Sequence, residues 1–333
     1  MKKERYKELF FLFSFILLSF LILFCAFFLG INDLSTKEIF NDNSSGTLTP
    51  LAMARITRIL ASFLVGGSLA LAGSVYQAVL HNPLAEPFIL GVSGGAAVGT
   101  ALAFITGAAV TGTFFIPLFA SSGGLFAVIL VLLLGMTGRG EKNTILLSGV
   151  IMGTLSSSIL MCLISFAGTQ EMCSITWFLM GDLSAADPVL LRFSCFFAPL
   201  IAFLLFLLSP KANALASGED YARGIGVDPV KTGYALLILA TLLTAASVAL
   251  SGIISFVGLI VPHILRKWGF ADNRKLFPLS FFTGGIFLIF CDFLSRNIFQ
   301  AREIPAGVIT SFSGGLLFLW ILYKKNLNGR KGL

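Results

Sequence analysis

Four arginines lie at the ends of apolar stretches, where their charge can bind an acidic group. Arg55 and Arg58 are three residues apart at the start of one stretch, a spacing that puts them on one helix face. Arg296 and Arg302 flank the segment between the last two stretches. A planar guanidinium holds a carboxylate through two parallel hydrogen bonds. The pattern predicts a cationic patch for an acidic partner; contact with lipid headgroups, or no function, is the alternative.

The motifs of a P-loop and of a zinc protease are absent from the sequence. A P-loop needs a Gly-Lys dipeptide and none occurs, so an ATP site in this chain is excluded. HExxH is also absent. His81 and His263 each lie beside a proline, and the five cysteines form no CxxC pair, so neither a zinc site nor a disulfide framework is indicated. We expect no cofactor, no metal and no enzymatic activity.

Asp292 is the acidic residue best placed to couple transport to an ion gradient, because ionisable groups inside a membrane commonly serve that purpose. Arg296 follows it by four residues on the same helix face, so a local ion pair is the simpler interpretation. No apolar stretch collects the several polar groups that an intramembrane enzyme needs.

A long polar segment separates two apolar stretches in the second half of the chain. Residues 209–231 read SPKANALASGEDYARGIGVDPVK, which is long for a connection within a helical bundle. The segment contains a helix-compatible piece, Ala214–Arg223, that ends at Gly224. We expect a partly helical element that offers a docking surface on the cytoplasmic face.

Membrane-spanning helices are the elements that must position these residues. Of the 333 residues, 56% are hydrophobic and 12% are charged, and the mean hydropathy is +0.93; soluble domains carry about 25% charged residues. A span needs about 20 apolar residues. The fold class is therefore all-α, a polytopic membrane protein with about ten spans. The predicted spans are 9–30, 57–80, 88–107, 114–135, 144–166, 190–209, 232–250, 252–267, 277–297 and 304–323, the third and eighth being the weakest. The 34 residues between Lys231 and Arg266 carry no Asp, Glu, Lys or Arg and are too few for two full spans, so a break at Ser251-Gly252 is predicted.

The placement of Lys and Arg predicts the orientation, because basic residues concentrate in cytoplasmic loops. Ten spans with both ends in the cytoplasm leave six of the 23 basic residues outside. The net charge of +7 is spread over short loops and does not indicate nucleic-acid binding. The predicted outer basic residues are Lys37, Arg55, Arg58, Arg192, Arg296 and Arg302.

Five segments resemble the iron-siderophore, haem and vitamin B12 permease family of ABC importers. They follow the family's order and spacing, and the similarity covers roughly residues 50–323. NPLAEP followed by LGVSGG, with FVGLIVPHILR downstream, is highly specific. The segments are Arg55–Gly99, Trp177–Ser184, Ser217–Val227, Ser251–Arg266 and Glu303–Thr310.

The resemblance implies a type II ABC importer permease fold of ten helices in a single domain, 1–333. It implies a dimer of two permease copies (a homodimer or a pair of close paralogues), separate cytoplasmic ATPase subunits and an extracytoplasmic substrate-binding protein. The family's docking arginines match Arg55, Arg58 and Arg296, with Arg302 nearby. Its cytoplasmic gate corresponds to Asn143 and Thr144. Its ATPase-coupling element matches the loop within 209–231, including Gly218, Glu219, Arg223, Gly224 and Gly226.

The sequence therefore predicts the permease subunit of an ATP-driven importer in the bacterial cytoplasmic membrane. The resemblance makes an Fe(III)-siderophore the first expected substrate, with haem and cobalamin as further options. An ion-coupled secondary transporter is the alternative, and a membrane subunit without a pathway is a third.

Overall fold

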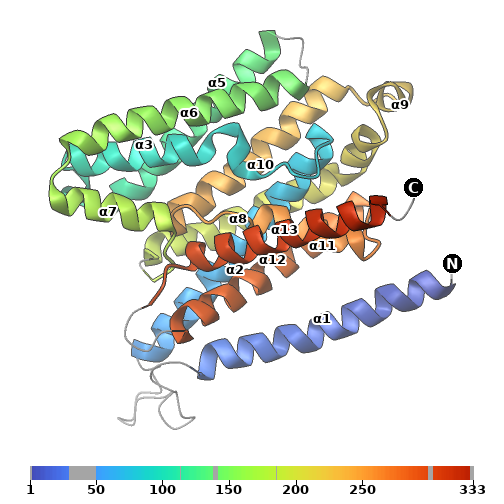
Figure 1. The fold of residues 1–333 in the computed structure, drawn as a ribbon, viewed down its shortest axis with the longest axis horizontal. Coiled ribbons are helices and arrows are strands. Elements are labelled where there is room, and N and C mark those ends of the chain that lie inside the picture. Colours follow the sequence, from blue (N-terminus) through green and yellow to red (C-terminus); the bar gives the residue numbers. More distant parts are fainter. Residues whose placement is uncertain are drawn as a thin grey trace.

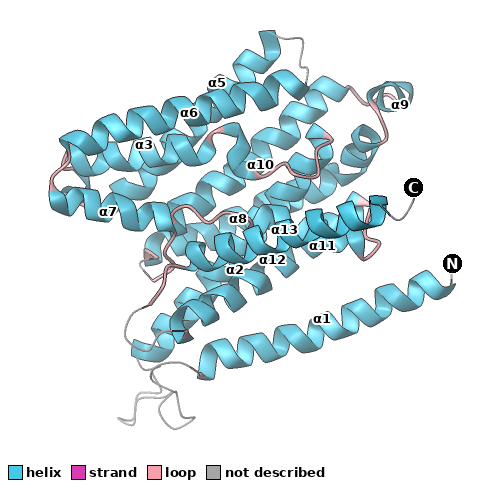
Figure 2. Ribbon diagram, viewed as in Figure 1, coloured by secondary structure: helices cyan, strands magenta, loops and turns pink. Residues whose placement is uncertain are grey.

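The computed structural model describes residues 2–29, 50–112, 114–137, 142–184, 186–298 and 303–330. Within these ranges the chain forms helices and no strand (Figure 2). In chain order the helices are α1 Lys2–Phe28, α2 Pro50–Leu80, η1 Pro87–Leu90, α3 Val92–Ile105, α4 Ala108–Thr111, α5 Phe115–Thr137, α6 Lys142–Phe166, α7 Thr169–Met180, α8 Pro188–Ala216, α9 Glu219–Gly224, α10 Pro229–Ser251, α11 Val257–Lys267, α12 Asn273–Asn297 and α13 Ala306–Arg330.

Each of the ten predicted stretches coincides with one α-helix, the stretch 88–107 also including η1, and the all-α membrane fold is confirmed. In the described part of the chain, six helices are long and apolar enough to cross a membrane: α2, α5, α6, α8, α10 and α12. Shorter apolar helices lie at residues 14–28, 92–105 and 306–320. The two weak predictions correspond to the short helices α3 and α11, so a count of ten full spans is approximate.

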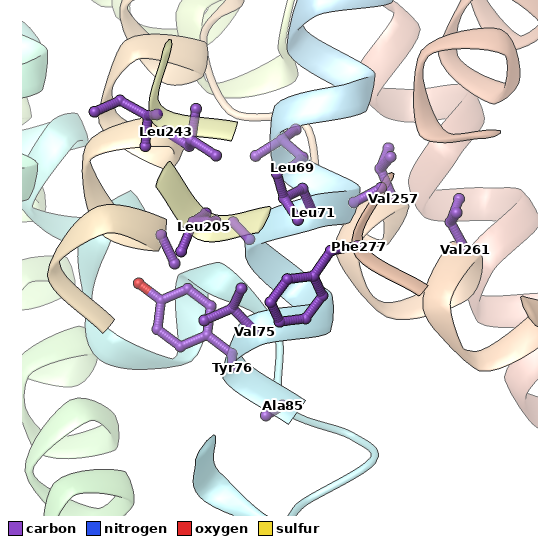
Figure 3. Packing of buried hydrophobic residues seen from close by; sticks show 14 of the residues in the cluster. Leu69, Leu71, Val75, Tyr76, Ala85, Leu205, Leu243, Val257, Val261 and Phe277 are labelled. Atoms are coloured by element: carbon purple, nitrogen blue, oxygen red, sulfur yellow. The ribbon is translucent and has the colours of Figure 1, made fainter. Parts of the chain in front are cut away.

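Helix α2 forms the centre of the bundle, and every residue from Leu64 to Leu80 is buried. Its side chains contact α8, α10, α11 and α12 (Figure 3). A Cβ on Gly73 would lie 1.9 Å from the carbonyl oxygen of Gly258 in α11. Small residues let helix backbones approach closely, and that close packing stabilises helix pairs in lipid. The glycine-rich sequence of α2 therefore gives it its central place.

The predicted break at Ser251-Gly252 is confirmed. Helix α10 ends at Ser251, Gly252 adopts a φ of +70°, and α11 begins only at Val257. Irregular backbone inside a membrane protein needs hydrogen-bond partners from the protein itself. Here Ile253 N donates to Phe178 O at 3.2 Å, and Asp182 N donates to Ser251 O at 2.8 Å. These partners come from the last turn of α7, a helix that was not predicted from the sequence, and from the residue two positions after it.

The two ends of the bundle carry different features. The start of α1 and the end of α13 lie at the same end as α9 (Figure 1), which we call the α9 end. The start of α2 and the last turns of α12 lie at the opposite end. We call this the arginine end, because it carries Arg55, Arg58 and Arg296.

Candidate functional site

The arginine end contains a cluster of ionised side chains from α2, α12 and the segment before α13. Arg58 Nε donates to Asp292 Oδ1 at 2.8 Å, and Arg58 Nη1 donates to Glu303 Oε2 at 2.7 Å. Arg296 Nε lies 3.3 Å from Asp292 Oδ2. The Asp292 side chain is 1% exposed, so a single buried carboxylate joins two guanidinium groups.

The local ion pair between Asp292 and Arg296 is thus confirmed, and a second partner is added. Arg58 lies 234 residues away in the sequence, and only the packing of α2 on α12 brings it to Asp292. Burying a carboxylate is expensive unless opposite charges and hydrogen bonds compensate. The two arginines provide that compensation here, which accounts for an acid inside a membrane helix.

Arg55 and Arg296 also hold the end of α1. Arg55 Nη1 donates to Phe27 O at 2.6 Å, and Arg296 Nη2 donates to Ala26 O at 3.4 Å. The last carbonyl groups of a helix lack partners within it and carry partial negative charge, so they favour cations. Arg55 is 6% exposed and Arg296 is 7% exposed. Both were predicted to lie on the outer side, but the structure buries most of each side chain.

A cavity of about 440 Å³ opens beside the cluster. Arg55, Arg58, Arg296 and Glu303 contribute its charged lining, and mostly apolar residues of α2 and of the segment leading into α8 complete it. The predicted arginines are therefore brought together around one space. Arg302, the fourth predicted docking residue, lies outside the described residues. Glu303 was missed as a site residue, although it directly precedes the IPAGVIT part of the last family-like segment.

At the α9 end, the predicted loop is shorter than expected. Helix α8 does not stop near Ser209 but continues through Pro210 to Ala216, and the separate short helix α9 starts only at Glu219. The prediction of one helical piece over 214–223 was therefore wrong. The extension is held by tertiary contacts, because Asn213 accepts from Asn273 N at 2.8 Å and donates to Asp272.

Asp272 caps the start of α12 next to this extension. Partial burial acts to raise the pKa of its carboxyl group, but hydrogen bonds from Arg274 N and Asn213 Nδ2 act in the opposite direction. The charges of Arg274 and Lys275 add to that effect, and the pKa of Asp272 lies below its usual value. The carboxylate therefore remains ionised and links the last turns of α8 to the start of α12.

Helix α9 is set between two glycines with left-handed backbone. Gly218 has a φ of +122° and Gly226 a φ of +80°, a region that other residues rarely adopt. Ala222 is buried, whereas Tyr221 and Ile225 are 57% and 55% exposed. The glycine turns thus fix a short helix that presents two large apolar side chains outward at this end of the bundle.

A small cavity of about 80 Å³ joins α9 to the start of α6. Glu219 and Arg223 line it from α9, and Ile145 lines it from α6. The predicted gate residues directly precede Ile145: Asn143 is exposed and Thr144 is half-buried. The structure therefore brings the predicted coupling and gate residues to the same end of the molecule.

No group of three or more His, Cys, Asp and Glu residues that could hold a metal ion occurs in the described ranges. His81 Nδ1 lies 3.2 Å from Val79 O, and the His263 ring packs near Phe318. The five cysteines are free thiols. Within the described residues, the ionised cluster and the α9 segment are therefore the candidate functional sites.

Comparison with known proteins decides the class. The model of the FecCD transport family matches residues 16–324. The chain belongs to the FecCD transport family. The predicted resemblance is confirmed, and the chain is a multi-pass membrane permease of the ABC importer type.

Relatives of this FecCD-family chain carry consistent descriptions. The vitamin B12 import system permease protein BtuC of Vibrio vulnificus is 33% identical over 314 residues, which cover 93% of each chain. The ABC transporter permease protein YvrB of Bacillus subtilis is 36% identical over 282 residues, covering 83% of this chain and 79% of the relative. A solved inward-facing structure of a metal-chelate type ABC transporter has a TM-score of 0.83 and 29% identity, covering 94% and 98% of the two chains.

Proposed function

We propose that this FecCD-family chain is the permease subunit that carries a bulky metal chelate from a substrate-binding protein into the cytoplasm. The observation that carries the proposal is the arginine cluster, which opens on a cavity of about 440 Å³ at one end of the chain. Two copies of the single domain 1–333 would enclose the path. Both termini would be cytoplasmic, and their position at the α9 end supports this orientation (Figure 1).

The binding protein would dock on three arginines, Arg55, Arg58 and Arg296, with Arg302 as a further contact. Arg58 is the member with the clearest outward contact, since Glu303, its partner, is 44% exposed. Acidic side chains on the binding protein would pair with this cluster, as carboxylates do with guanidinium groups. Replacing Arg58 with Gln should weaken docking to the purified complex, and normal docking would refute the assignment.

Separate ATPase subunits would hydrolyse ATP and would bind the permease at α9. The exposed Tyr221 and Ile225 suit an apolar recess in such a subunit, and Gly218, Glu219, Arg223, Gly224 and Gly226 shape the element. Movement of α9 would reach Asn143 and Thr144 through the cavity that Glu219 and Ile145 share. Closure of the ATPase pair would in this way switch the cytoplasmic gate.

The substrate is a metal chelate, with an Fe(III)-siderophore as the first choice. Cobalamin is the second, because relatives over most of this chain are vitamin B12 import permeases; haem is the third. A competition assay distinguishes the three candidate substrates. It measures how a radiolabelled ferric siderophore, cyanocobalamin and haem compete for the binding protein of the same system. Failure of all three to bind would refute this substrate class.

An ion-coupled secondary transporter is the rival function, and the energy source distinguishes the two. The importer predicts that proteoliposomes containing the permease and its ATPase take up substrate only with ATP. Uptake by this chain alone, driven by a proton or sodium gradient, would instead support the rival. Asp292, the residue such coupling would use, is held by two arginines.

A further inference from the structure

The two carboxylates that contact Arg58 differ sharply in exposure. The Asp292 side chain is 1% exposed and the Glu303 side chain is 44% exposed. Asp292 holds Nε of the guanidinium, while Glu303 holds Nη1 on the side that lines the cavity. One contact therefore fixes the direction of the arginine, and the other occupies the donor that an incoming molecule would meet.

We propose that Glu303 is an exchangeable occupant of Arg58, which a carboxylate side chain of the arriving binding protein displaces. The inference rests on the proposed docking function and deepens it. Glu303 offers Arg58 the same chemical group that the partner would offer, at the same donor atom. In the undocked permease it keeps the charge of Arg58 balanced.

The backbone around Glu303 supports an exchange that involves only the side chain. Ile304 N donates to Ser295 O at 3.2 Å, and Gly307 N donates to Gly181 O at 3.2 Å. The backbone that follows Glu303 is therefore tied to α12 and, through the first turn of α13, to the residue after α7. Exchange would then require only rotation of the Glu303 side chain away from Arg58.

The energetic difference between the two pairs also favours exchange at Glu303. An exposed ion pair contributes little because water competes for both charges. A buried pair such as Arg58–Asp292 is costly to break, since it leaves a buried charge uncompensated. A partner carboxylate would displace Glu303 and leave Asp292 in place, and the buried contact would keep the guanidinium aimed at the partner.

The test compares docking of the chelate-free binding protein of the same transport system to the permease–ATPase complex in nanodiscs. Glu303→Gln removes the competing charge and keeps the shape of the side chain, so docking should tighten about two- to fivefold, the range expected for one exposed ion pair. Glu171→Gln is the matched control, because it removes a carboxylate from α7 at the arginine end. It should leave the affinity unchanged.

Further outcomes separate this inference from the docking proposal. In an Arg58→Gln background, Glu303→Gln should no longer change the affinity. Unchanged or weaker docking of Glu303→Gln, or an equal gain in Glu171→Gln, would overturn the exchange while leaving docking at Arg58 intact. Normal docking of Arg58→Gln alone would instead overturn the docking role itself.

Discussion

Asp292 is the residue whose removal should most disturb the arginine end. Its carboxylate accepts from Arg58 at 2.8 Å and lies 3.3 Å from Arg296 Nε. Asp292→Asn keeps the size of the side chain but removes the negative charge between two guanidinium groups. Those groups are only 13% and 8% exposed, so water cannot replace the lost partner fully.

The size of the effect follows from this burial. Breaking a buried ion pair by removing one partner costs about 3–5 kcal/mol. Arg58 retains Glu303 in the variant, which favours the lower end of that range. A loss of about 3 kcal/mol corresponds to a roughly 150-fold rise in the population of the opened state.

The neighbouring Cys291 provides the assay, because its thiol is buried and becomes reactive only when the region opens. In a chain whose four other cysteines are replaced by alanine, Asp292→Asn should speed maleimide labelling of Cys291 by roughly 150-fold. Asp187→Asn is the control, since Asn caps a helix about as well as Asp does. A labelling rate within threefold of the parent would refute the argument that this carboxylate stabilises the cluster.

Three further predictions concern the rest of the molecule. Gly73→Ala should sharply reduce the yield of folded protein, because its Cβ would meet the α11 backbone at 1.9 Å. Gly153→Ala, which has open space around it, should leave the yield unchanged. Size-exclusion profiles in detergent compare the two variants. Gly226→Val should uncouple ATP hydrolysis from uptake, because the backbone φ of +80° at this position is one that valine rarely adopts. Gly224→Ala, whose added Cβ would meet no neighbour within 4 Å, should retain coupling. Paired measurements of ATPase and uptake rates test both variants. The stabilising effect of Asp272, whose pKa is lowered in the folded chain, should be present above pH 3.8 and disappear as the pH falls further, so melting curves of Asp272→Asn and the parent should converge in acid.

The positions of the membrane helices could be predicted because apolar stretches and their interruptions are local properties of the chain. The break at Ser251-Gly252 was predicted in the same way, from a charge-free stretch too short for two full spans. The extension of α8 past Pro210 could not, since proline usually ends a helix. Contacts of Asn213 with Asp272 and Asn273, about 60 residues away, hold that extension in place.

The cluster at the arginine end shows the same division between local and tertiary information. The spacing of Arg55 and Arg58, and that of Asp292 and Arg296, can be read from one helix at a time. The tertiary structure adds three contacts. Arg58 pairs with Asp292 across 234 residues, Glu303 pairs with the same arginine, and Arg55 and Arg296 bind the end of α1.

The sequence by itself determined the family, the helices and the residues that carry charge, because these depend on composition, period and motif. Tertiary structure alone decided which of those charges are buried and which face the cavity. The reason is physical: the exposure of an arginine depends on which distant helices pack around it, and close contact of α2 with α12 sets that packing here.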